Sequence, residues 1–88
     1  MIFLLSLTAA VLAFDSSAKA QSKLLESVKA NPKEAIAMCT EFKALNKKKI
    51  SALSNQSITE VAQRKNLSEL DAEILSTYVI GLNCPDVR

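Results

Sequence analysis

Histidine is missing from this sequence of 88 residues, and glycine (one), proline (two) and aromatic residues are scarce. Without histidine the chain has no Ser–His or Cys–His pair, and a zinc site would need two distant thiols and carboxylates. No Cys-x-x-Cys pair supports thiol–disulfide exchange, and no glycine-rich loop could hold a phosphate group. We therefore expect no enzyme, no cofactor and no metal site.

Charge does not single out a partner either. Eleven Lys and Arg residues stand against nine Asp and Glu residues, a formal net charge of +2. The densest positive run is the three lysines at 47–49. We interpret this run as a solvated helix end, favoured by the helix dipole, and not as a contact for nucleic acid or anionic lipid.

The N-terminal segment predicts export. An apolar run covers residues 2–14 and gives way to the polar stretch DSSAKAQS. The run has the length of the hydrophobic part of a signal peptide and is short for a bilayer span. Ala18 and Ala20 are small residues at the two positions that signal peptidase reads. We predict a signal peptide over residues 1–20, cleaved after Ala20, and a mature chain that begins at Gln21.

Two alternatives remain for this segment, which departs from the usual signal peptide in having no Lys or Arg before the apolar run. Cleavage could follow Ala13 instead, or the segment could stay uncleaved and anchor the protein in a membrane. In each case the protein is periplasmic or secreted, and membrane contact is made only through the N-terminal segment.

Residues 21–88 predict a single all-α domain. Ala, Leu, Lys, Glu and Gln fill its segments, and the alternation typical of strands is missing. We expect a small orthogonal bundle of about four short helices. The first covers residues 21–30, and the second starts at residue 32, with a core-facing part that ends near residue 45. The third ends near residue 65, and Gly81 and Pro85 mark the end of the fourth.

Boundary residues support these helices. The predicted N-caps are Asn31, Ser57 and Ser68, and Asn66 is the predicted left-handed C-cap of the third helix. Pro32 fits the first helical position after its cap. Glu34 and Glu60 each follow a predicted cap by three residues, so both can face back to it as in a capping box.

Apolar residues at helical spacing predict the core faces of the two longer helices. On the second helix the face is Ala35, Ile36, Met38, Cys39, Phe42 and Leu45. On the fourth it is Leu70, Ile74, Tyr78 and Leu82, widened by Leu75 and Val79. Packing these faces together would bring Cys39, in the middle of one face, near Cys84 at the end of the other helix.

The two cysteines, Cys39 and Cys84, predict a structural disulfide. In an exported chain with an even number of cysteines, no histidine to help bind a metal and no Cys-x-x-Cys pair for thiol exchange, a structural disulfide is the expected role of the cysteines. The alternative is that both are separate buried thiols, which act as small apolar side chains.

A second pattern crosses the third and fourth helices. In ITEVAQRKNLSELDAEILSTYV, core-like spacings relate Ala62, Leu67, Ala72 and Leu75. This stretch resembles the packing of a helix-turn-helix. Its second helix begins with Glu69, Asp71 and Glu73, which would repel phosphates, so we expect no nucleic acid partner. We interpret the pair Glu69 and Glu73 as a complement to the helix dipole and not as a cation site.

Two stretches carry a family resemblance. AMCTEFKALN (37–46) and YVIGLNCPDVR (78–88) resemble small exported two-cysteine helical proteins, known as uncharacterised products of marine cyanobacteria. The resemblance implies a helical fold and an exported location, and it brings no activity. A thinner resemblance, to periplasmic acid-stress chaperones, rests on Cys39, Phe42 and the cysteine spacing.

We expect a small exported helical protein that acts as a protein-interaction or ligand-binding module, on another protein or a small apolar ligand. The chaperone resemblance implies an alternative function, in which acid protonates the carboxylates, loosens the bundle and exposes its core.

Overall fold

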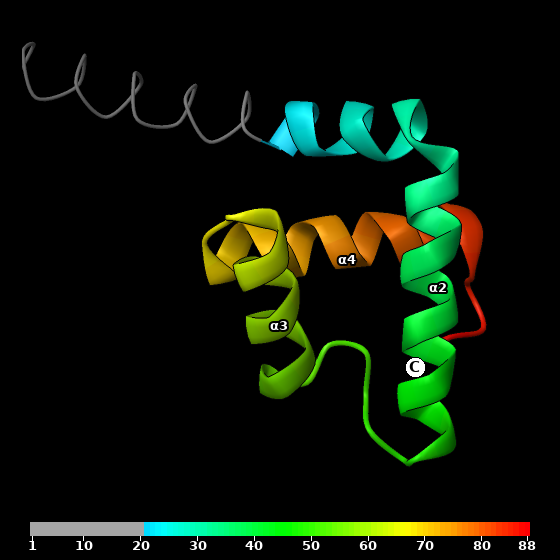
Figure 1. The fold of residues 1–88 in the computed structure, drawn as a ribbon. Helices are drawn as coiled ribbons and strands as arrows, with labels where there is room; N and C mark the ends of the chain where they lie inside the picture. The colour runs from blue at the N-terminus through cyan, green and yellow to red at the C-terminus, as the bar shows by residue number, and fades with distance from the viewer. Residues whose placement is uncertain (1–20) are drawn as a thin grey trace, which may run out of the picture.

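The computed structural model describes residues 21–88, and this part of the chain is helical without strands. It comprises the leading helix, described over residues 21–30, then α2 (Pro32–Lys47), α3 (Asn55–Lys65) and α4 (Glu69–Asn83) (Figure 1). The prediction of an all-α fold with about four helices is therefore confirmed. The predicted signal peptide, with Ala18 and Ala20, lies outside the described residues.

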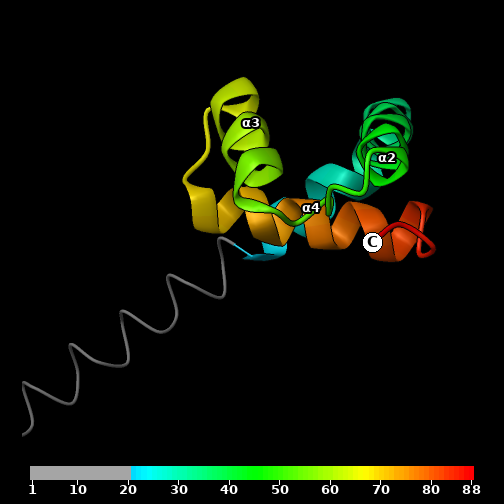
Figure 2. The same cartoon turned by 90° about the horizontal axis from the view of Figure 1, so that it is seen from below.

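The helices cross at steep angles. The leading helix and α4 extend to the same side of α2; the leading helix meets the start of α2 at a corner, and α4 crosses α2 further along (Figure 1). Seen from below, α2 and α3 stand on the same side of α4, near its two ends (Figure 2). Both contact α4, which therefore acts as the base of the bundle. None of the helices in the described residues is both long and apolar enough to cross a membrane.

The corner between the leading helix and α2 is built by Asn31 and Pro32. Pro32 occupies the start of α2 as predicted, where its missing N–H is not needed. Asn31 is the N-cap residue by position, but its side chain makes no cap bond; Nδ2 instead donates to Ser27 O at 2.9 Å. Glu34 does not face back to the cap either, because it pairs with Lys65 of α3.

The third helix begins one turn earlier than predicted. Its N-cap is Ser54, whose Oγ accepts a hydrogen bond from Ser57 N at 3.3 Å. The capping box predicted at Ser57 and Glu60 is therefore wrong: Ser57 is the third helical residue and is buried. Ser54 has Ser57 and not Glu or Gln three residues later, so the capping-box pattern indicated Ser57, whereas Ser54 is the serine with the extended cap conformation.

The remaining boundaries agree with the sequence. Asn66 has φ 55° and ψ 50°, the left-handed C-cap that ends α3. Ser68 caps α4 and accepts from Asp71 N at 3.1 Å. The last turn of α4 continues past Gly81 to Asn83, with Cys84 as C-cap. Lys47 ends α2, and the lysines at 47–49 are exposed, as expected.

The core face of α2 is confirmed with one exception. Ala35, Met38, Cys39 and Phe42 are buried, and Leu45 packs against them. The prediction is wrong for Ile36, because 60% of its surface is exposed.

The core face predicted for α4 is confirmed for Leu75 and Val79, which are buried, but its centre is wrong. Leu70 and Leu82 are 66% and 53% exposed. The buried residues are Ala72, Leu75, Ser76 and Val79. The true face is rotated from the predicted one by roughly a third of a turn, at 100° per residue. Since α2 and α3 both cross α4 on this side, small residues such as Ala72 and Ser76 permit the close approach that larger side chains would prevent.

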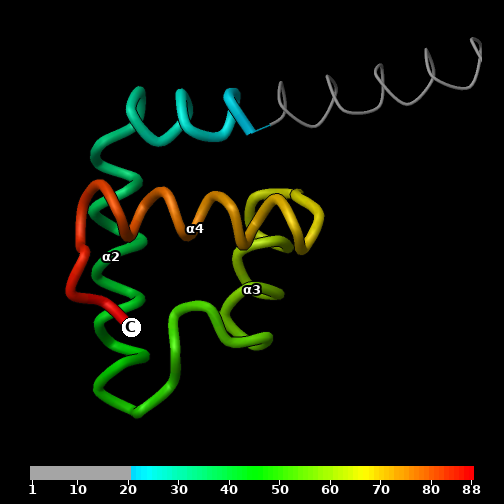
Figure 3. Tube along the Cα trace, turned by 180° about the vertical axis from the view of Figure 1, so that it is seen from behind, coloured from blue at the N-terminus to red at the C-terminus, as the bar shows by residue number. Residues whose placement is uncertain are grey.

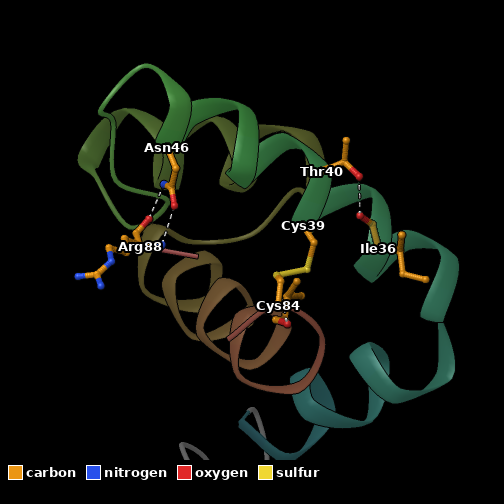
Figure 4. Close-up of a disulfide and its surroundings, with 7 residues drawn as sticks. Ile36, Cys39, Thr40, Asn46, Cys84 and Arg88 are labelled. Carbon is orange, nitrogen blue, oxygen red and sulfur yellow. Dashed lines mark hydrogen bonds between the residues drawn. A yellow bond between two sulfur atoms is a disulfide. The ribbon is translucent and has the colours of Figure 1, made fainter. Parts of the chain in front are cut away.

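Cys39 and Cys84 form the predicted disulfide, which joins α2 to the end of α4 (Figure 4). Their Cα atoms lie 6.0 Å apart, and 45 residues separate them in sequence. After Cys84 the chain turns back along α2 (Figure 3).

Candidate functional site

A cavity of about 150 Å³ lies among the leading helix, α2 and α4. Its apolar lining is Leu24 and Val28 of the leading helix, Ala35 and Met38 of α2, Leu67 of the α3–α4 turn, and Leu75 and Val79 of α4. Most of these side chains are also part of the hydrophobic core. The cavity is therefore an opening into the core and not a separate surface depression.

The corner at Asn31 creates this cavity. Because α2 starts with Pro32 directly after the leading helix ends, the two helices meet at a steep angle, and the leading helix is carried over α4 (Figure 1). Only its inner side reaches the core, through the buried Val28 and the half-buried Leu24. The space that these two side chains leave is the cavity.

The mouth of the cavity is polar. Ser27, Asn31, Glu34 and Lys65 complete its lining. Glu34 and Lys65 form an ion pair that links α2 to the end of α3. The Asn31 amide is bonded to Ser27 O. The charged groups at this mouth are Glu34 and Lys65.

The volume limits what the cavity can accept. Pockets for drug-sized ligands usually measure about 300–1,000 Å³. An apolar cavity of roughly 150 Å³ accepts a group the size of benzene. This cavity therefore fits one aromatic ring or one short branched alkyl group, and nothing much larger without rearrangement.

A second ion pair joins α2 to α3 about two turns further along α2. Glu41 accepts from both terminal nitrogens of Arg64, with Oε1–Nη1 and Oε2–Nη2 distances of 2.7 Å. The hydrogen bond to Glu41 raises the pKa of Arg64, so the guanidinium stays charged. This paired geometry orients α3 and, with it, the Lys65 side chain at the cavity mouth.

The two cysteines predicted as a disulfide lie outside the cavity lining. They are 6% and 2% exposed, so the bridge is covered by protein. The interpretation as a structural bridge therefore fits their position.

Glu69, one of the two acidic residues interpreted above as a complement to the dipole of α4, makes a hydrogen bond to α3. Glu69 Oε1 accepts a hydrogen bond from Thr59 Oγ1 at 3.0 Å, which ties α4 to α3. Within residues 21–88 no group of three potential metal-ligating side chains comes together.

Comparison with known proteins gives one match. The model of a family described as a domain of unknown function (DUF8664) matches residues 25–84, well over half of the chain. The protein belongs to this family. The matched span includes α2, α3, α4, both cysteines and the cavity lining apart from Leu24. Neither the curated proteins nor the solved structures gave a match.

Sequence reasoning did not find the cavity. Leu24 and Val28 share one side of the leading helix, which was the available indication that this helix covers the core. The pairing of Glu34 with Lys65 joins residues far apart in sequence, and helical spacing says nothing about such a contact.

Proposed function

We propose that this protein is a small exported binding module that holds one apolar side chain of a partner protein in the cavity between the leading helix, α2 and α4. The observation that carries the proposal is the cavity itself: an apolar interior, a polar mouth and a volume of about 150 Å³. A buried anchor side chain in a fitted pocket is the usual source of affinity in protein interfaces. The volume favours a single side chain over a larger free ligand.

A cavity-filling variant tests this proposal. Toluene, as a probe of benzene-like size, should shift the NMR signals of the Val28, Met38, Leu75 and Val79 methyl groups and raise the melting temperature. In Ala35→Leu, which adds three carbons at a buried position of the lining, both effects should disappear. Ala37→Leu is the matched control, because Ala37 is exposed on the same helix. Absence of any toluene effect on the native protein would contradict the proposal.

Export is the second part of the proposal. It is supported by the apolar run and Ala-Lys-Ala stretch before Gln21, and a disulfide suits an oxidising compartment. Intact-mass measurement on the exported protein should give a chain that begins at Gln21. A mass that retains residues 1–20 would favour the membrane-anchored alternative instead.

A further inference from the structure

We propose that the partner segment is acidic: an apolar side chain enters the cavity, and a carboxylate next to it in the partner peptide takes the place of Glu34 beside Lys65. This inference rests on the proposed function, since it concerns the same cavity. It adds the chemistry of the group at the mouth, which the apolar interior does not specify.

The two charged residues at the mouth are not equivalent. The Lys65 side chain is 26% exposed and the Glu34 side chain 50%. The aliphatic stem of a lysine can cover an apolar surface while its ammonium reaches water. Lys65 therefore belongs to the cover of the cavity, whereas Glu34 approaches it from the solvent side.

Glu34 can leave this pair at little cost. It lies in the first turn of α2, where the helix dipole favours a carboxylate even without a cation partner. A half-exposed ion pair contributes little to stability, and its carboxylate is readily solvated. An incoming carboxylate can thus replace Glu34 while Lys65 keeps its place over the cavity.

A cationic partner would face the opposite situation. Its charge would compete with Lys65 for Glu34, and Lys65 would have to withdraw both its ammonium and the stem that lines the cavity. Complementary charge at the rim also speeds association and suppresses wrong partners. The mouth therefore favours an acidic peptide over a basic one.

Three matched hexapeptides test the inference. Each is acetylated and amidated and has glycine at four positions, with phenylalanine followed by glutamate, glutamine or lysine at the centre. Binding is measured by NMR titration of the native protein at low salt. We expect the glutamate peptide to bind about threefold to tenfold more tightly than the glutamine peptide, and the lysine peptide to bind most weakly.

Two variants locate the effect. Lys65→Met should bring the ratio of the glutamate-peptide to the glutamine-peptide affinity to about one, whatever its effect on the binding of both peptides, while Lys48→Met, at an exposed lysine outside the cavity, should keep the ratio of the native protein. Glu34→Gln should strengthen binding of the glutamate peptide, because Lys65 loses its competing partner.

The outcomes separate the two proposals. If no peptide shifts the cavity signals, the proposed function itself is wrong. If the three peptides bind equally, or the lysine peptide binds best, the cavity function stands and the acidic partner is wrong. If the glutamate preference persists in Lys65→Met, the carboxylate is recognised elsewhere, and the role of Lys65 is overturned.

Discussion

Asn46, near the end of α2, and Arg88 are joined by two hydrogen bonds between a side-chain amide and the backbone (Figure 4). Asn46 Nδ2 donates to Arg88 O, and Arg88 N donates to Asn46 Oδ1, both at 2.7 Å. Ala52 N also donates to Arg88 O at 2.7 Å. The amide of Asn46 thus pairs with the backbone much as another peptide group would, and it holds the segment after Cys84 against α2.

Replacing Asn46 by alanine should release this segment. Asn46 Nδ2 also donates to Ile50 O at 3.0 Å, so the variant loses three hydrogen bonds. Each is worth about 1 kcal/mol, so the free energy of unfolding in urea should fall by about 3 kcal/mol. The neighbouring exposed Lys47 provides the control, since Lys47→Ala leaves these bonds in place. Equal stability of the two variants would show that the segment is held by other contacts, such as the buried Val87.

Removal of the disulfide should destabilise the domain strongly. For the loop of 45 residues that it closes, the chain-entropy model gives about 4 kcal/mol. That is a large share of the total stability of a small domain. We expect Cys39→Ala combined with Cys84→Ala to lower the urea midpoint sharply, and reductant to do the same to the native protein.

As an internal control, reductant should leave the urea midpoint of the double variant unchanged. Two free thiols on titration of unreduced exported protein would refute the bridge.

The cap of α3 can be tested at Ser54. Ser54→Ala should cost about 1 kcal/mol, because the amide of Ser57 loses its acceptor. Ser54→Asp should retain most of the stability, since aspartate is an equally good N-cap. Thermal unfolding of the three proteins measures the difference, and no loss in Ser54→Ala would mean that the cap bond contributes nothing in solution.

Ser76 offers a route to higher stability. Its Oγ is fully buried and, among the described residues, finds no hydrogen-bond partner. Alanine removes this unsatisfied hydroxyl and has a higher helix propensity, so Ser76→Ala should gain about 1 kcal/mol. Ser22→Ala makes the same change at an exposed position of the leading helix and serves as the control for the propensity effect. A loss of stability in Ser76→Ala would indicate that a buried water bonds the hydroxyl.

Local signals in the sequence were reliable where the backbone itself enforces them. Pro32 fits the start of a helix because its ring fixes φ near the helical value and its missing N–H is not needed there, and Asn66 tolerates the left-handed conformation that ends α3. The disulfide between the two cysteines was predictable because the chain has no histidine for a metal site and no Cys-x-x-Cys pair for thiol exchange. These features depend on a few neighbouring residues and not on how the helices pack.

The buried face of α4 could not be chosen from hydrophobicity. The larger apolar residues Leu70 and Leu82 indicated one face, whereas the helix-turn-helix-like spacing of Ala72 and Leu75 indicated another, and the second is the one buried. Because two helices cross α4, the side chains at the crossings must be small enough to let the helices approach. The buried face of α4 is therefore the one with the small side chains. The cavity escaped prediction for the same reason: it is a gap left by three helices, and no single helix encodes it.

The position of the disulfide divides the chain mechanically. If the chain is pulled between the leading helix and the residues after Cys84, the force passes from Cys39 to Cys84 through the disulfide. Residues 40–83 then carry none of it. Such a force would first peel away the leading helix and then the first turns of α2, and it would stop at Cys39. Leu24, Val28, Ala35 and Met38 all lie in the part that would be stretched. Tension on the N-terminal side would therefore dismantle the cavity while α3 and α4 stay folded behind the bridge.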